Sequence, residues 1–346
     1  MFHALRVAAI DDLTSDSVAI TLDVPDDLQD EFAFEPGQHV IIGLDAKENV
    51  ASERRTYSLC TAPGSGRWQI GVKRLPGGAF SETRLATLQP GDTIDVMAPI
   101  GSFGPRAHAE HLGLIAAGSG VTPILSIARA ALAADSAVTL LYASRNEQTV
   151  MFLDDLADLK DSHPDRFHLI HVFSRQQTES ELLSGRLDGD RLKRILGPLV
   201  DPETIDDWYL CGPFDMVTEL SSTLEAAGAS SVHRELFHVD DAPPPPRPAE
   251  AFVDGGPAVT ATLDGRTSTY TLTPEDDSVL AGLLRVRPEA PFACRGGVCG
   301  TCRAKVLDGA VEMRHNYALE PDELEAGYVL TCQSWPTTPD VTLSYE

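Results

Sequence analysis

The chain has 346 residues, of which 42% are hydrophobic, and its formal net charge at pH 7 is −25. This length exceeds one ordinary hydrophobic core and predicts two or three domains. The acidic excess argues against nucleic acid and anionic membrane as partners. Six cysteines do not make a disulfide framework, and the sequence holds no signal-type segment or membrane-length apolar run. We therefore expect a cytoplasmic protein.

Residues 1–105 are predicted to fold as an antiparallel β-barrel. Apolar or alternating stretches are bounded by turn residues, and no helix long enough to connect parallel strands separates them. Several short strands in this arrangement are typical of a barrel. The expected strands include 18–24, 38–44 and 68–73, and a short helix is expected over 81–88.

Two motifs in this barrel suit a flavin nucleotide. Arg55 precedes Tyr57 and Ser58, so a guanidinium could pair with a diphosphate, a ring could stack on a heterocycle and a hydroxyl could bond its polar edge. Gly78 and Ser81 lie where a glycine turn opens a helix, which makes an anion site. An arginine beside a tyrosine also occurs on solvated strand faces, so the prediction depends on the two motifs together.

Residues 106–239 are predicted to form an α/β domain with a doubly wound parallel sheet, because strand-like and helix-like segments alternate. Thr122 is the expected N-cap of the first helix, with Pro123 at its first position. The expected strands are 112–117, 138–144, 167–173 and 207–210, and the expected helices are 121–134, 151–160 and 215–227.

Two glycine turns in this domain indicate a nucleotide site. Gly118 and Gly120 connect a strand to a helix, and Cys211 and Gly212 end a later strand. The carboxyl ends of parallel strands share one edge of the sheet, where such folds bind ligands, so we expect the two turns to meet. The alternatives are a tight connection without a ligand and, for Cys211, a place in the core.

The residues after two strands bear on which dinucleotide binds. Arg145 follows the strand ending at Ser144, and Ser174 and Arg175 follow the strand ending at Phe173. A carboxylate at such a position selects the ribose of NAD, whereas an arginine accommodates the 2′-phosphate of NADP. This pattern favours NADPH and leaves NADH possible.

Residues 240–252 contain four consecutive prolines and are predicted to be an extended linker. Residues 253–346 follow as a third domain. Two strands, 258–263 and 267–272, are predicted to form a hairpin around Asp264 and Gly265, and a helix is expected over 278–285.

Four cysteines in the third domain form a metal-ligand pattern. Cys294, Cys299 and Cys302 are spaced Cys-x4-Cys-x2-Cys, and Cys332 lies further along the chain. This is the spacing of ligands for a plant-type 2Fe-2S cluster. The alternative is a structural zinc site, whose cysteines usually come as two matched Cys-x2-Cys halves. The spacing favours the cluster, which would carry one electron at a time.

The order of these motifs resembles the ferredoxin-reductase-type flavoprotein reductases with a C-terminal plant-type ferredoxin domain, over nearly the whole chain. The resemblance implies a β-barrel for FAD, an α/β domain for the nicotinamide nucleotide and an α+β domain of the β-grasp type for the cluster. Within the family, the phenylacetyl-CoA epoxidase branch looks most similar. The segments that carry this are 294–306, 309–313, 316–321 and 327–332.

The resemblance also implies a relay of electrons from NADPH through FAD and the cluster to an oxygenase protein. Reductases of ketosteroid hydroxylases and aromatic-ring dioxygenases share the frame, so these acceptors stay open. A zinc-binding module and a redox sensor are the more distant alternatives. By resemblance, the residues that hold FAD are Arg55, Tyr57, Ser58, Val72, Lys73, Gly78 and Ser81. The nicotinamide nucleotide is lined by Gly118, Gly120, Thr122, Pro123, Cys211 and Gly212, and the flavin has Glu235 and Phe237 nearby. The reacting groups would be Tyr57, Ser58, Cys211 and Glu235.

Overall fold

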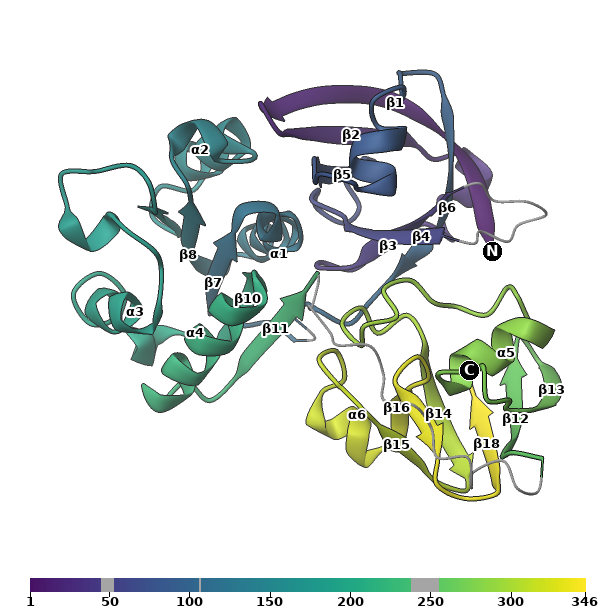
Figure 1. The fold of residues 1–346 in the computed structure, drawn as a ribbon. Helices are drawn as coiled ribbons and strands as arrows, with labels where there is room; N and C mark the ends of the chain where they lie inside the picture. Colours follow the sequence, from purple (N-terminus) through teal and green to yellow (C-terminus); the bar gives the residue numbers. More distant parts are fainter. Residues whose placement is uncertain (45–52, 106, 238–254) are drawn as a thin grey trace. The chain divides into compact units, whose positions relative to one another are not determined.

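A computed structural model describes residues 1–44, 53–105, 107–237 and 255–346 (Figure 1). The described chain divides into two compact units. The larger contains Phe2–Leu44 and Arg55–Phe237, and the smaller is built on residues 255–346. The predicted linker, 240–252, lies outside the described residues. Among the described residues, no helix is long and apolar enough to span a bilayer.

The larger unit begins with a six-stranded sheet in the order β4-β3-β6-β1-β2-β5. Its strands are β1 (Phe2–Thr14), β2 (Ser17–Asp23), β3 (His39–Leu44), β4 (Glu53–Ser58), β5 (Trp68–Lys73) and β6 (Thr93–Ile100). β1 pairs antiparallel with β2 and β6. β5 pairs antiparallel with β2, and β3 pairs antiparallel with β6. Leu59 bridges to Ile70 of β5, which closes the sheet. The predicted antiparallel barrel is confirmed.

The helix expected over 81–88 is wrong in type and extent. The chain instead forms a short π-helical segment at Ala79–Arg84. The N–H of Leu85 donates to the carbonyl of Phe80 at 2.9 Å, which is the i→i−5 bond of a π-turn. Leu85 and Leu88 then enter the barrel core, so the chain leaves the helical path early.

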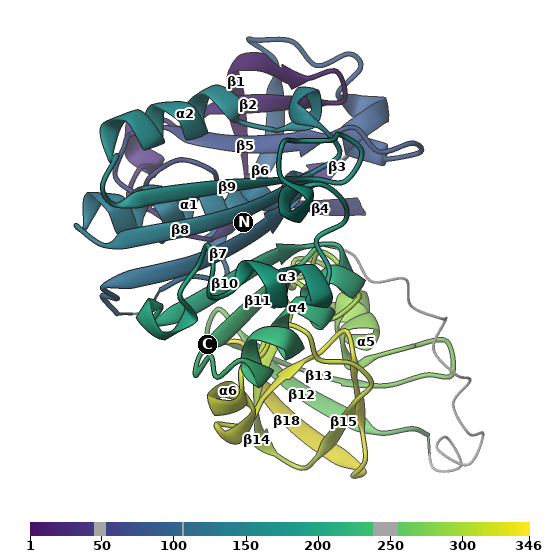
Figure 2. The same ribbon diagram turned by 90° about the vertical axis from the view of Figure 1, so that its left-hand side faces the viewer.

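The second half of the larger unit is a parallel sheet in the order β11-β10-β7-β8-β9 (Figure 2). Helices cover both faces: α1 and α2 lie on one, and α3 and α4 on the other (Figure 1). The predicted doubly wound α/β architecture is confirmed. The strands are β7 (His111–Ala117), β8 (Ala137–Ser144), β9 (Phe167–Phe173), β10 (Asp207–Gly212) and β11 (Val232–Leu236). The helices are α1 (Val121–Ala133), α2 (Leu153–Ser162), α3 (Gly189–Ile195) and α4 (Phe214–Ala226).

Thr122 is not the N-cap of α1, contrary to the prediction. Residues Gly118–Gly120 form a 3-10 turn that continues directly into the helix, and Gly120 takes the cap position. The Thr122 hydroxyl donates to the carbonyl of Ser119 at 3.0 Å from within the first turn. The helix therefore begins before the residue whose side chain looked like its cap.

The smaller unit combines a five-stranded sheet, in the order β13-β12-β18-β14-β16, with the pair β15-β17 and two helices. This arrangement agrees with the predicted α+β domain. Its elements are β12 (Ala258–Leu263), β13 (Arg266–Thr271), α5 (Val279–Val286), β14 (Arg303–Asp308), β15 (Val311–Met313), α6 (Pro321–Glu325), β16 (Tyr328–Leu330), β17 (Ser334–Pro336) and β18 (Asp340–Ser344).

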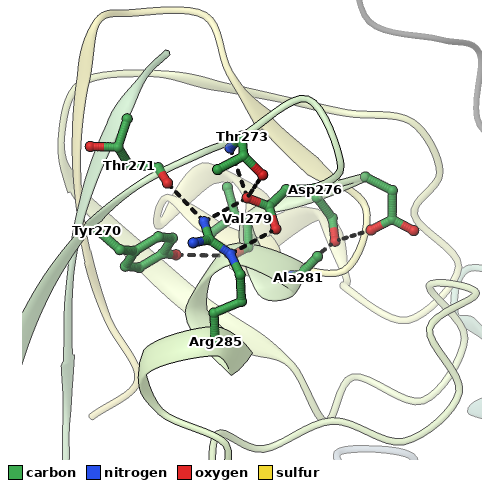
Figure 3. Close-up of polar contacts among 9 residues, drawn as sticks. Tyr270, Thr271, Thr273, Asp276, Val279, Ala281 and Arg285 are labelled. Atoms are coloured by element: carbon green, nitrogen blue, oxygen red, sulfur yellow. Dashed lines mark hydrogen bonds and ion pairs between the residues drawn. The ribbon is translucent and has the colours of Figure 1, made fainter. Parts of the chain in front are cut away.

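Polar contacts fasten α5 to the hairpin that precedes it (Figure 3). Ser278 caps the helix by accepting from the N–H of Ala281 at 3.2 Å. The nearly buried carboxylate of Asp276 accepts from Arg285 Nη2 at 2.7 Å. Tyr270 donates its hydroxyl proton to the carbonyl of Val279 at 2.9 Å. These bonds satisfy buried polar groups at the start of α5, whose Leu280 belongs to one hydrophobic cluster with Cys302 and Cys332.

Candidate functional site

A buried carboxyl group joins the barrel to the parallel sheet. Glu235, on β11, accepts a hydrogen bond from Ser58 Oγ, at the end of β4, with 3.4 Å between the oxygens. Its side chain is only 11% exposed. Burial raises the pKa of Glu235 to about 8, so the carboxyl holds its proton at neutral pH. A neutral acid of this kind can donate a proton to a neighbouring ligand.

His39 is a member of this site that sequence reasoning missed. Its Nδ1 lies 4.0 Å from Glu235 Oε1, and its Nε2 is buried without a hydrogen-bond partner among the described residues. Burial lowers the pKa of His39 to about 4, so the ring is neutral beside the neutral carboxyl. The only signal in the sequence was a histidine at the start of an apolar strand.

The two glycine turns meet, as expected, at the carboxyl edge of the parallel sheet. Cys211 is fully buried and lies opposite Glu235 in the pairing of β10 with β11. A Cβ placed on Gly120 would lie 2.2 Å from the Cys211 carbonyl oxygen, so only glycine allows this approach. Burial raises the pKa of Cys211, and the Glu235 carboxyl adds to the rise, so the group is a thiol rather than a thiolate.

The flavin motifs of the barrel also come together. The rings of Tyr57 and Phe80 lie 5.3 Å apart at an interplanar angle of 52°. Gly78 lies close to Ser81, since a Cβ there would fall 2.2 Å from Ser81 Oγ and the serine side chain would have to move. Val72 is completely buried in the barrel core.

Lys73 reaches across to the first glycine turn of the parallel sheet. Its Nζ lies 3.8 Å from a Cβ built on Gly118, whose φ is +53°. A cation beside a turn that opens a helix suits a phosphate group. Pro123 and Thr122 are buried in the helix that follows this turn, and a Cβ on Gly71 of the barrel would meet Thr122 Cγ2 at 2.6 Å.

The two candidate arginines for a 2′-phosphate differ in their surroundings. Arg145 Nη2 forms an ion pair with Asp16 Oδ2 at 2.7 Å. Arg175 is exposed, and its backbone N–H donates to the Arg145 carbonyl at 2.8 Å. Ser174 is exposed beside it. Phe237 is 38% exposed, so its ring is not part of the hydrophobic core.

The four predicted ligands of the metal site gather in two pairs. The thiol of Cys299 lowers the pKa of Cys294, and the thiol of Cys332 raises the pKa of Cys302, so each of these cysteines responds most to one neighbouring thiol. The hydrogen bond from Cys299 lowers the pKa of Cys294, which favours its thiolate. Backbone and side-chain donors also face the sulfurs: the N–H of Gly296 lies 3.4 Å from Cys294 Sγ. Such donors stabilise negative charge on a cluster.

Pairing by twos fits a cluster with two irons, because each iron takes two protein thiolates. A zinc ion would gather its ligands around a single point. Arg295, Gly297 and Gly300 have φ values of 55°, 78° and 67°, which wind the loop tightly between the ligands. The residues therefore fit a 2Fe-2S cluster.

Comparison with known families and proteins agrees with this geometry. Three family models match: the oxidoreductase FAD-binding domain over residues 4–104, the oxidoreductase NAD-binding domain over 114–222 and the 2Fe-2S iron-sulfur cluster binding domain over 261–337. FAD, a nicotinamide dinucleotide and a 2Fe-2S cluster are thus the cofactors of this oxidoreductase.

Similarity to individual proteins extends over the full chain. One component of 1,2-phenylacetyl-CoA epoxidase from Escherichia coli (strain K12) is 40% identical over 355 residues, covering 100% of this chain and 98% of that protein. The ferredoxin reductase component of 3-ketosteroid-9-alpha-monooxygenase from Rhodococcus rhodochrous is 30% identical over 350 residues, covering 99% of this chain and 96% of that protein.

A solved structure shares the fold. Phthalate dioxygenase reductase has a TM-score of 0.60 to this chain at 22% identity, with 99% of this chain and 98% of that chain covered. Barrel, parallel sheet and cluster domain thus occur together in both molecules. The chain belongs to the FAD- and NAD-binding oxidoreductases with a C-terminal 2Fe-2S domain, the electron-transfer reductases of oxygenase systems.

Proposed function

We propose that this reductase passes electrons from NADPH, through FAD and the 2Fe-2S cluster, to the oxygenase component of a phenylacetyl-CoA epoxidase in phenylacetate degradation. The observation that carries the chemistry is the hydrogen bond between Ser58 and Glu235, at 3.4 Å, where the barrel meets the nucleotide sheet. The full-length similarity to a component of the Escherichia coli epoxidase supports the choice of acceptor.

Each part of the larger unit has a role in this proposal. When bound, FAD would supply hydride acceptance and release of single electrons, and the cluster would carry these electrons one at a time. Arg55 would pair with the diphosphate of FAD, and Tyr57 would contact its ring system. Ser58 and the protonated Glu235 hold a proton at the polar edge of the flavin ring. Cys211 stays neutral and adds no charge beside the nicotinamide.

The glycine turns and the lysine position the dinucleotide. Gly120 lets the first turn lie against the Cys211 backbone, and the side chain of Lys73 lies beside Gly118. In this proposal the pyrophosphate of the dinucleotide binds at that turn, where backbone N–H groups and the ammonium face it. Cys211 and Glu235, which are paired on neighbouring strands, would then contact the nicotinamide.

The choice of acceptor is tested by supplying the purified reductase with NADPH and either of two oxygenase components. We expect kcat/KM with the oxygenase of a phenylacetyl-CoA epoxidase to exceed that with a ketosteroid hydroxylase oxygenase by at least about tenfold, the factor given by 1.4 kcal/mol of docking free energy. Cytochrome c is the non-specific control acceptor, and it measures the intrinsic rate of the relay. An equal or higher value with the ketosteroid oxygenase would contradict the assignment.

The choice of dinucleotide is tested by Arg175→Ala. A lost charge-assisted bond to the 2′-phosphate should lower kcat/KM for NADPH by about 10- to 100-fold and leave that for NADH unchanged. Arg145→Ala is the matched control, because the Arg145 guanidinium is already paired with Asp16. If Arg145→Ala instead changes the NADPH:NADH ratio, the phosphate binds there. A wild-type preference for NADH would overturn the proposal for NADPH.

A further inference from the structure

Thr331, which precedes the ligand Cys332, joins several segments of the smaller unit. It is completely buried. Its N–H and its hydroxyl both donate to the carbonyl oxygen of Cys302, at 3.1 and 2.9 Å. Its own carbonyl accepts from the N–H of Leu280, in the first turn of α5, at 3.1 Å. Thr331 is thus hydrogen-bonded to Cys302 and is the neighbour of Cys332 in the sequence, so it connects the two cysteines of one ligand pair.

The C-terminal end of the chain closes this network. Tyr345 donates its hydroxyl proton to Thr331 Oγ1 at 2.8 Å. A threonine hydroxyl has one proton, and the proton of Thr331 is used for the Cys302 carbonyl, so the phenol must be the donor. The backbone N–H of Tyr345 donates to the carbonyl of Thr262, which is the penultimate residue of β12, at 3.0 Å. The ring is therefore held at its backbone and at its hydroxyl.

The bonds run in one direction, from Tyr345 through Thr331 to Cys302. Hydrogen bonds aligned in this way strengthen one another in a buried environment. Both O–H dipoles point their positive ends toward the segment that carries the ligand. Hydrogen bonds and local charge near an iron-sulfur cluster adjust its reduction potential, since the reduced cluster carries an additional negative charge.

We propose that Tyr345 is a positioning residue for the Cys302–Cys332 half of the cluster site. Through Thr331 it fixes the two ligand segments against each other, slows loss of the cluster and raises its reduction potential. Tyr345 acts through Thr331, and its action does not depend on which oxygenase accepts the electrons.

The test is Tyr345→Phe in the full-length holoprotein. We expect the cluster to bleach about fivefold faster in the presence of an iron chelator, the factor that one ordinary hydrogen bond supplies. We also expect a more negative reduction potential and a changed EPR spectrum of the reduced cluster. Reduction of ferricyanide by NADPH at the flavin should be unchanged.

Tyr270→Phe is the matched control. It removes the same atom from the same domain, and the hydroxyl of Tyr270 donates to the carbonyl of Val279. The N–H of that peptide group, at Leu280, bonds the carbonyl of Thr331 and not its hydroxyl, so this control leaves the hydroxyl path to Cys302 intact. It should lower the free energy of unfolding to a similar extent without changing the potential or the EPR spectrum. Equal effects of the two substitutions on cluster loss, potential and spectrum would overturn the proposal.

A second pair of variants decides the matter if Tyr345→Phe fails to assemble. Thr331→Ser keeps the hydroxyl that connects Tyr345 to Cys302, and Thr331→Val removes it while keeping the shape. Retention of the cluster and its spectrum in Thr331→Ser, with loss in Thr331→Val, supports the proposal. If the two variants behave alike, the hydroxyl network does not hold the site and the proposal is wrong.

Discussion

Replacing Glu235 by Gln should slow the reduction of bound flavin by NADPH by roughly 100-fold, the lower range for removing a positioned proton donor. The amide has nearly the shape of the carboxyl and can still accept the hydrogen bond from Ser58. It has no acidic proton to give. The dissociation constant for NADPH should change little, because the lost function concerns the reaction and not the binding of the dinucleotide. Stopped-flow absorbance separates the two quantities.

The pKa of Glu235 determines how the rate of flavin reduction should change with pH. Burial raises the pKa of Glu235 from 4.5 to about 8. The wild-type rate should therefore fall as pH rises through about 8 and the carboxyl ionises, whereas the rate of Glu235→Gln should stay level there. Glu225→Gln, the same change at an exposed position of α4, is the control and should behave like wild type.

Stability provides a readout of Glu235 that does not depend on turnover. A carboxyl that binds its proton more tightly in the folded state stabilises the fold fully below pH 4.5, and this contribution is lost as pH rises toward 8. The melting temperature of the wild type should decline across this window more than that of Glu235→Gln. Parallel curves for the two proteins would show that Glu235 is ionised in the folded state, and would remove the basis for its role as an acid.

Local signals in the sequence were enough to predict most of the larger unit. The helix expected over 121–134 is α1, Val121–Ala133, and the strand expected over 167–173 is β9, Phe167–Phe173. Both have apolar runs bounded by turn residues. β11, Val232–Leu236, does not stand out as an apolar run, because only Leu236 is buried in it. Its pairing along one edge of β10 determines that strand, and no local pattern encodes this pairing.

Spacing made the site residues easier to predict than their surroundings. The cysteines and glycine turns are visible as motifs because their chemistry requires particular residues at short intervals. The ion pair of Arg145 joins it to Asp16, 129 positions earlier in the chain, and no motif connects them. His39 and Tyr345 were missed for the same reason. Their partners come from other segments of the chain, and burial, which shifts the pKa of Glu235, exists only in the folded chain.

The largest effect is expected for Cys332→Ser. This change removes one thiolate of the Cys302–Cys332 pair, and a serine hydroxyl is a much poorer ligand for iron than a thiolate. Electron transfer to the oxygenase should fall by more than about 100-fold, the upper end of what supporting residues around a metal contribute. Reduction of ferricyanide by NADPH should continue, because electrons can leave at the flavin. Iron content and the visible spectrum report the cluster directly.

Cys60→Ser makes the same chemical change away from the site. Cys60 is completely buried, and its thiol lies 3.2 Å from the carbonyl oxygen of Gln69, a contact that a hydroxyl can keep. This control should retain iron and both activities. If Cys332→Ser also kept its iron and its transfer to the oxygenase, the fourth ligand would be another residue and the pairing of Cys302 with Cys332 would have no role in the relay. Loss of both activities together would mean that the flavin depends on the cluster, and the two steps would not be separable as proposed.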